Sequence, residues 1–265
     1  MGLRRVAATR YVTPLREGGS MPAIVEADDS GTYVLKFRGA GQGPKALVAE
    51  IIAGEIARAL GLPVPSLVLM RLDPLLGRNE PDYEIRSLLQ KSSGLNLGVD
   101  YLPGSLAFEP GISLVSPSLA AQVVWFDALV ANVDRTARNT NLLWWHKQLY
   151  LIDHGAALIF HHEWHHEWTA EETVVAAEDQ TKARQPFSRI RDHVLLPMAG
   201  DVLEADRELA PRLTEAILRD IVALVPTEWL DGESLRERYV RHFVERLTGP
   251  RTFAEDAEHA RTAHV

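Results

Sequence analysis

Apolar and polar residues alternate along the first part of the chain in the manner of short β-strands. The stretches 6–13, 21–27 and 31–37 show this pattern, and turn formers separate them, Gly18-Gly19 first and Asp28 to Gly31 second. Consecutive strands joined by short turns pair in the antiparallel sense. The pattern therefore predicts an antiparallel meander.

A helical pattern follows at 44–60, where apolar residues recur every three to four positions. Pro44 stands in its first turn and Gly61 just past its end, as is typical of helix ends. Two further strand-like stretches, 66–72 and 95–102, are joined by a connection rich in Pro, Gly and Asn. The first third of the chain is thus predicted to be a sheet that carries one helix.

The pattern changes after Pro103-Gly104. A long apolar stretch, 118–133, predicts a mostly buried helix, and 141–145 with 148–152 predict a hairpin that turns at His146-Lys147. Beyond residue 169 the pattern is helical nearly to the end. The clearest helical stretches are 194–209, 211–225 and 233–247.

These elements predict an α+β fold in two lobes. Residues 1–103 form a small antiparallel β-rich N-terminal lobe with one helix. Residues 104–250 form a larger, mainly helical C-terminal lobe, with the polar segment 134–140 and the hairpin at the junction. Residues 251–265 are polar and Ala-rich, and predict a loose C-terminal tail.

Composition narrows the classes of function. The chain has 265 residues, 46% of them hydrophobic, which is enough for a sizeable core. No apolar run reaches the roughly 20 residues of a membrane span, and arginines interrupt the N-terminal segment, so we expect a cytoplasmic protein. The absence of cysteine excludes disulfides and thiolate metal sites, and the net charge of -8 argues against general binding to nucleic acid.

The polar segment at the junction carries residues suited to phosphoryl transfer. Asp134 and Asn139 lie five residues apart on a loop that leaves a buried helix, and Asp153 follows at the end of the hairpin. Phosphoryl transfer requires a carboxylate near the attacking hydroxyl and a divalent metal, and Mg²⁺ prefers carboxylate and amide oxygens. We therefore predict Asp134 as the base and Asn139 and Asp153 as metal ligands. Their order along the chain is that of the kinase catalytic loop and its metal-binding aspartate.

The N-terminal lobe carries matching residues. Lys36 lies near the end of a predicted strand, where a lysine could contact phosphates, and Glu50 lies on a small apolar face of the following helix. A carboxylate that faces inward requires a cation, so we expect Glu50 to pair with Lys36. Gly18 and Gly19 in the first turn could let backbone N–H groups approach a phosphate.

At these positions the sequence resembles the HipA-like kinases, which share a fold with protein kinases and phosphatidylinositol kinases. The resemblance covers roughly residues 15–160. It rests on GGSMP, YVLKF, ALVAEIIAGEIARALGLPVP, GLNLGVDYLPG, NVDRTARNTNLL and LYLIDHG.

The resemblance implies an ATP- and Mg²⁺-dependent kinase with a protein serine or threonine as the preferred acceptor. Gly18, Gly19 and Ser20 would lie over the phosphates, and Glu50 would orient Lys36 toward them. The stretch from Leu97 to Leu102 would be the hinge whose backbone binds adenine. The hinge residues within it are Gly98, Val99, Asp100, Tyr101 and Leu102. HipA toxins carry an additional N-terminal segment, so pairing with a DNA-binding antitoxin, a family trait, is left open.

Three alternatives remain at this point. The first is a kinase of the same fold that acts on a lipid or a small molecule, and the second is a nucleotide-binding pseudokinase. The third is a zinc hydrolase, because His162 to His166, HEWHH, fits the H-E-x-x-H pattern of metalloproteases if the segment is helical. Several histidines close together also produce this pattern by chance.

Overall fold

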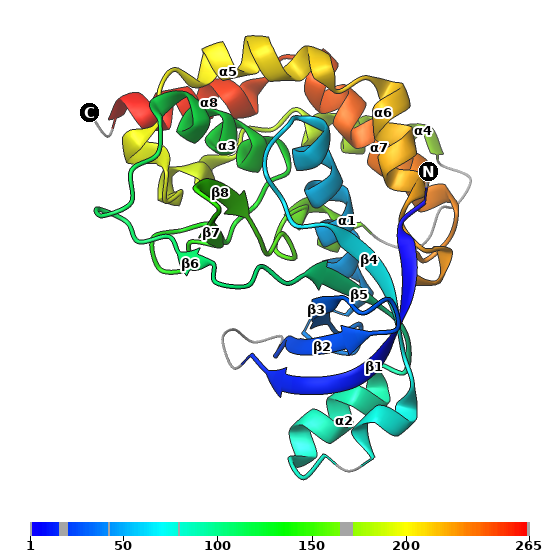
Figure 1. Ribbon diagram of the computed structural model, residues 1–265. Coiled ribbons are helices and arrows are strands. Elements are labelled where there is room, and N and C mark those ends of the chain that lie inside the picture. Colours follow the sequence, from blue (N-terminus) through cyan, green and yellow to red (C-terminus); the bar gives the residue numbers. More distant parts are fainter. Residues whose placement is uncertain (1, 16–20, 42, 79, 165–171, 264–265) are drawn as a thin grey trace.

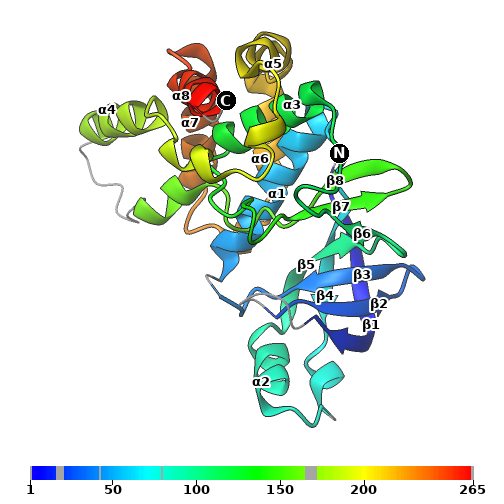
Figure 2. The same ribbon diagram turned by 90° about the vertical axis from the view of Figure 1, so that its left-hand side faces the viewer.

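The computed structural model describes residues 2–15, 21–41, 43–78, 80–164 and 172–263, the last range without the side chains before Ala177. Figure 1 shows a β-barrel at one end of the molecule and a lobe of helices at the other. The helix α1 lies between them, and the view in Figure 2 agrees. None of the helices within the described ranges is long and apolar enough to cross a membrane.

The barrel has five strands in the order β1-β2-β3-β5-β4. The predicted meander is confirmed, because β1 pairs with β2 and β2 with β3 in the antiparallel sense. A parallel pair between β1 and β4, which the sequence pattern did not predict, closes the barrel. Apolar side chains that point inward at every second position fill its interior. The strands are β1 (Arg4–Pro14), β2 (Ala23–Ala27), β3 (Thr32–Lys36), β4 (Leu67–Leu72) and β5 (Gly94–Asp100).

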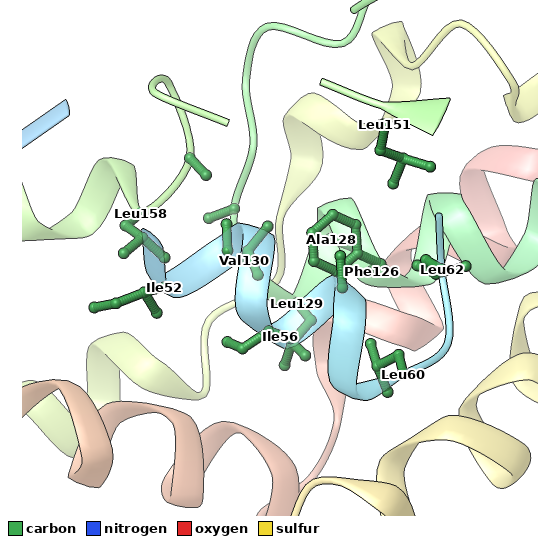
Figure 3. Packing of buried hydrophobic residues seen from close by; sticks show 14 of the residues in the cluster. Ile52, Ile56, Leu60, Leu62, Phe126, Ala128, Leu129, Val130, Leu151 and Leu158 are labelled. Carbon is green, nitrogen blue, oxygen red and sulfur yellow. The ribbon is translucent and has the colours of Figure 1, made fainter. Parts of the chain in front are cut away.

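The helix α1 (Pro44–Ala59) joins the barrel to the helical lobe. It is apolar on nearly every face, and its side chains belong to the same buried cluster as the outer face of the barrel and the helical lobe. Figure 3 shows Ile52 and Ile56 of α1 among Leu129, Val130 and Leu158. A helix that is buried all round is held by packing on every side, so it fixes the position of Glu50 relative to both lobes.

The helical lobe is organised around α3 (Pro117–Leu129), whose buried face includes Trp125 and Phe126. The helix begins where Ser116 accepts a hydrogen bond from the backbone N–H of Leu119, with Pro117 in the first turn. It ends at Leu129, four residues earlier than predicted, and Ala131 then adopts the left-handed conformation with φ 50°. The other α-helices of this lobe are α4 (Glu172–Ala183), α5 (Val202–Leu209), α6 (Glu215–Ala223), α7 (Ser234–Thr248) and α8 (Thr252–Ala263).

A three-stranded sheet of β6 (Leu106–Ala107), β7 (Leu142–Trp145) and β8 (Gln148–Leu151) lies beside α3. The predicted hairpin and its turn are confirmed. His146 and Lys147 both have positive φ, as a two-residue turn between right-twisted strands requires. The hairpin thereby brings the residues after Leu151 back beside the start of β7.

Three predictions about the elements are wrong. The stretch 194–209 is α-helical only over Val202–Leu209 (α5), because Leu196–Met198 forms a 3₁₀-helix and the backbone is extended at Ala199.

The N-terminal lobe carries a second helix, α2 (Tyr83–Lys91), at the end of the barrel far from the helical lobe (Figure 1). Asp82 caps it, and the apolar residues Ile85, Leu88 and Leu89 bury one face against the barrel.

The C-terminal residues do not form a loose tail. They form α8, which buries Phe253, Ala254 and Ala257. The ring of Phe253 packs at 5.7 Å from that of Trp125 on α3, and the guanidinium of Arg246 lies 4.7 Å above it. Small apolar residues at helical spacing bury this helix in spite of its polar composition.

Replacement of Phe253 by alanine therefore lowers the free energy of unfolding. Because the side chain is only 1% exposed, the loss is about 3 to 5 kcal/mol. Urea unfolding measures it, with Leu114→Ala as the control, since Leu114 is 90% exposed. Equal stability of the two variants would show that α8 does not contribute to the core.

Candidate active site

The side chains of Lys36, Glu50 and Asp153 meet between the two lobes. Lys36 ends β3, Glu50 lies in the middle of α1, and Asp153 follows β8. The ammonium of Lys36 donates to Oε1 of Glu50 and, over 2.7 Å, to Oδ1 of Asp153. Three elements from distant parts of the chain thus meet at one ammonium group. The predicted pairing of Glu50 with Lys36 is present.

Burial and charge act in opposite directions on these groups. Burial alone would lower the pKa of Lys36, but the two carboxylates raise it above its ordinary value. Lys36 in turn holds the pKa of Asp153 below its usual range. Glu50 is the most buried of the three, and burial raises its pKa to about 7 against the opposing effect of Lys36.

The loop after α3 carries Asp134, whose carboxylate accepts a hydrogen bond from the amide of Asn139 over 2.7 Å. A second amide, that of Asn141, lies 3.4 Å from the same oxygen. Asn141 was not predicted, although the spacing Asn139-Thr140-Asn141 is a signal that an amide pair faces this loop. Asn141 and Asp153 both have φ near 50°, the left-handed conformation, which asparagine and aspartate adopt more readily than other non-glycine residues.

A buried cluster behind this loop was missed by sequence reasoning. Asp127 of α3 accepts hydrogen bonds from the amide of Asn132, from Nε of Arg135 and from Nε2 of His193. Arg135 also donates to the backbone carbonyls of Asn141 and Ile152. Arg135, the residue after Asp134, is therefore hydrogen-bonded to Ile152, the residue before Asp153.

The residues after Asp153 pack tightly against Glu50. A side chain at Gly155 would place its first carbon 3.3 Å from Oε1 of Glu50, so the absence of a side chain leaves room for the carboxylate. His154 is buried, contacts the ring of Phe126 edge-on, and has its Nδ1 3.8 Å from Glu50. Burial lowers the pKa of His154 to about 3, so its imidazole is neutral at physiological pH.

The predicted nucleotide contacts fare differently. Gly18, Gly19 and Ser20 lie outside the described residues. Gly98 and Val99 lie within β5, which pairs with β3 on one side and β4 on the other, so their backbone groups are used by the sheet. The backbone N–H groups of Asp100 and Tyr101 likewise bond the carbonyls of Ser66 and Thr32. Tyr101 and Leu102 lie just beyond the strand, in the connection to the helical lobe.

The histidine-rich segment begins with a 3₁₀-helix, η2 (Ile159–Glu163), and its backbone is extended at Trp164. The α-helical register that H-E-x-x-H requires is therefore interrupted inside the motif, and His166 lies outside the described residues. Within the described ranges no three His, Cys, Asp or Glu side chains are placed to hold a metal ion. His161 instead pairs with the hydroxyl of Tyr239 on α7 over 2.9 Å, which anchors the segment to the helical lobe.

Comparison with known proteins identifies this arrangement. The family model described as HipA-like kinase matches residues 9–248. The chain belongs to the HipA-like kinase family. No curated protein sequence matches significantly.

A solved structure shows a similar fold at low sequence identity. The Helicobacter pylori proinflammatory kinase CtkA aligns with a TM-score of 0.58 at 15% identity, over 96% of this chain and 97% of that one. A Golgi casein kinase with Mn and ADP bound aligns with a TM-score of 0.49 at 10% identity, over 98% of this chain and 73% of that one. The CtkA match establishes a kinase-like fold that extends over the whole of this HipA-like kinase.

The buried histidines of this HipA-like kinase make its stability depend on pH. Burial lowers the pKa of His154 and His161 to about 3 and that of His242 well below its usual range. The unfolded chain takes up protons near pH 6.5 that the folded chain excludes. The free energy of unfolding therefore rises with pH, and falls on acidification by up to about 1.4 kcal/mol per pH unit for each histidine.

Urea unfolding between pH 7 and pH 5 measures this slope. His242→Phe removes one of the titrating groups and makes the slope shallower, whereas His259→Gln, at an exposed position, leaves it unchanged. A wild-type slope equal to that of His242→Phe would contradict the assignment.

Proposed function

We propose that this HipA-like kinase transfers the γ-phosphoryl group of ATP to a hydroxyl group, with a serine or threonine of a protein as the acceptor. The observation that carries the proposal is the sharing of the Lys36 ammonium between Glu50 and Asp153. A buried ammonium held by two carboxylates is positioned before a substrate arrives, so it can stabilise phosphate charge without reorganisation.

Asp134 is proposed as the base that orients the acceptor hydroxyl and takes its proton. Its carboxylate is half-buried, and the amides of Asn139 and Asn141 on one of its oxygens restrict its rotation. A carboxylate fixed in this way presents its other oxygen in a defined direction. Correct orientation of this kind accounts for much of the rate in phosphoryl transfer.

Asn139 and Asp153 are the proposed ligands of Mg²⁺. The Asp153 side chain is 46% exposed, so its carboxylate is accessible even though one oxygen bonds Lys36. The amide of Asn139 uses its nitrogen toward Asp134, which leaves its oxygen as a metal donor. Carboxylate and amide oxygens fit a hard cation. When bound, Mg²⁺ would supply positive charge that neutralises the phosphates.

Adenine is proposed to contact the connection between the lobes at Tyr101 and Leu102. We narrow the hinge to the carbonyl of Tyr101 and to Leu102, because the sheet already uses the backbone of Gly98 and Val99 and the N–H of Tyr101 donates to the carbonyl of Thr32. The proposal for Gly18 to Ser20 as a phosphate-contacting turn stands on the sequence alone.

The test is phosphoryl transfer by purified protein carrying Asp134→Ala or Asp153→Ala. Asp134→Ala loses transfer by about 10² to 10⁴-fold, the usual contribution of a positioned acid or base. Asp153→Ala also loses transfer, because it removes a proposed metal ligand. Asp220→Ala, which removes an exposed carboxylate of α6, serves as the control and keeps the wild-type rate. Wild-type rates in both site variants would contradict the proposal.

The acceptor class is determined by incubation of the enzyme and γ-labelled ATP with lysate protein, lipid extract or small hydroxylated metabolites. Label in the protein fraction on serine or threonine supports the proposed acceptor. Label in the lipid or metabolite fraction would replace it. A thermal shift with ATP and Mg²⁺ but no transfer in any fraction would instead indicate a pseudokinase.

A further inference from the structure

His193 lies far from the predicted site residues in sequence but contacts the loop that carries Asp134. It follows the 3₁₀-helix η3 (Ser188–Asp192) in the helical lobe. Its backbone pairs with that of Thr136, and the N–H of Val194 donates to the carbonyl of Arg135 over 3.1 Å. The chain at His193 and Val194 therefore runs along the back of the loop as a short strand partner.

The imidazole of His193 is held at both nitrogens. Nδ1 accepts a hydrogen bond from the backbone N–H of Leu195 over 3.1 Å, so the ring proton resides on Nε2. Nε2 then donates to Oδ2 of Asp127 over 2.8 Å. This pairing specifies one tautomer and one ring orientation.

Asp127 passes this constraint on to Arg135. The same Oδ2 accepts from Nε of Arg135 over 2.6 Å, while Oδ1 accepts from the amide of Asn132 over 2.8 Å. All of these side chains are buried. Burial alone would raise the pKa of Asp127, but Arg135 and His193 hold it below its usual range, so the carboxylate remains charged.

Arg135 connects the two halves of the site. Its guanidinium donates to the carbonyls of Asn141 and Ile152, which flank the hairpin, and the backbone N–H of Ile152 donates to the same Asn141 carbonyl over 3.0 Å. Asp134 precedes Arg135, and Asp153 follows Ile152. A shift of the guanidinium would therefore change the separation of the two proposed functional carboxylates.

We propose that His193 is a positioning residue for phosphoryl transfer, which acts through Asp127 and Arg135 to hold Asp134 in register with Asp153. The inference rests on the proposed function for its consequence in catalysis, but not for its geometry. Misplacement of a reacting group by about 1 Å costs on the order of 10²-fold in rate. We call the hydrogen-bonded chain His193–Asp127–Arg135 the brace. Loss of the brace thus lowers kcat and leaves the nucleotide contacts of the other lobe in place.

Two substitutions at this position separate the donor from the acceptor. In His193→Gln the side-chain amide reaches the place of Nε2 and can donate to Asp127. In His193→Asn the amide reaches only the place of Nδ1, near the N–H of Leu195. We expect kcat to fall about 10²-fold in His193→Asn and His193→Ala, with KM for ATP within about threefold, and to recover within about fivefold of wild type in His193→Gln.

Asp206 provides a matched control for general damage to the core. Like Asp127 it is a buried carboxylate that accepts from an arginine, Arg251, and from an aromatic N–H, that of Trp125, but it faces α8 and not the loop. Asp206→Asn should lower thermal stability and leave kcat near that of wild type. If it lowers kcat as much as His193→Ala does, the effect is structural and the inference is wrong.

Amide hydrogen exchange provides a readout that does not depend on activity. His193→Asn and His193→Ala should accelerate exchange in peptides covering 132–141, whereas His193→Gln should not. Unchanged exchange there, or equal kcat in the Gln and Asn variants, would overturn the inference. If wild type transfers no phosphate but the exchange pattern holds, the proposed function fails and the brace itself remains.

Discussion

The arrangement of the site depends on the ion pairs that the Lys36 ammonium forms. This ammonium is shared by a carboxylate of α1 and a carboxylate that follows the hairpin, so it connects the barrel, the joining helix and the helical lobe at one point. A buried carboxylate such as Glu50 is unfavourable unless a cation and hydrogen bonds compensate for its lost hydration. The structure meets this requirement by burying α1 on all sides, which brings Glu50 to the ammonium and keeps it there.

The second constraint is the hydrogen bonding behind the loop that carries Asp134, where a buried side chain donates to backbone carbonyls. The chain reverses between α3 and β7, and Arg135 in this loop bonds the carbonyl of Asn141 before β7 and that of Ile152 after β8. Asp127 balances its charge, with side-chain exposure of 0% for both. Ala131 at the start of this loop has φ 50°, a left-handed conformation that strains the backbone of an alanine. Strain of this kind persists because the buried hydrogen bonds around it hold the loop in one conformation.

Much of this could be predicted from the sequence, for identifiable reasons. The strands and α1 follow from the hydrophobic period, and the pairing of Glu50 with Lys36 follows from the cation that an inward-facing carboxylate requires. Asp153 was predicted only as a metal ligand, and its bond to Lys36 was not predicted. α2 was missed although Asp82 and the spacing of Ile85 and Leu88 indicate a capped amphipathic helix. Asp127 also had a sequence signal, because it is a carboxylate inside the apolar stretch AAQVVWFDALV. His193 had no such signal, because its contact with Asp127 spans 66 residues and depends on the tertiary fold.

The C-terminal helices α7 and α8 help to fix the end of α3, which the polar composition of these helices did not indicate. Arg246 of α7 donates to the carbonyls of Ala128 and Leu129, at the end of α3, and to those of Ala183 and Gln185, at the end of α4. Burial lowers the pKa of its guanidinium to about 9, yet it remains charged at neutral pH, and cations are favoured at helix C-termini. One side chain thus ends α3 at the point where the loop to Asp134 must begin. Phe253 of α8 covers that guanidinium, so a helix far from the cleft helps to determine where the loop starts.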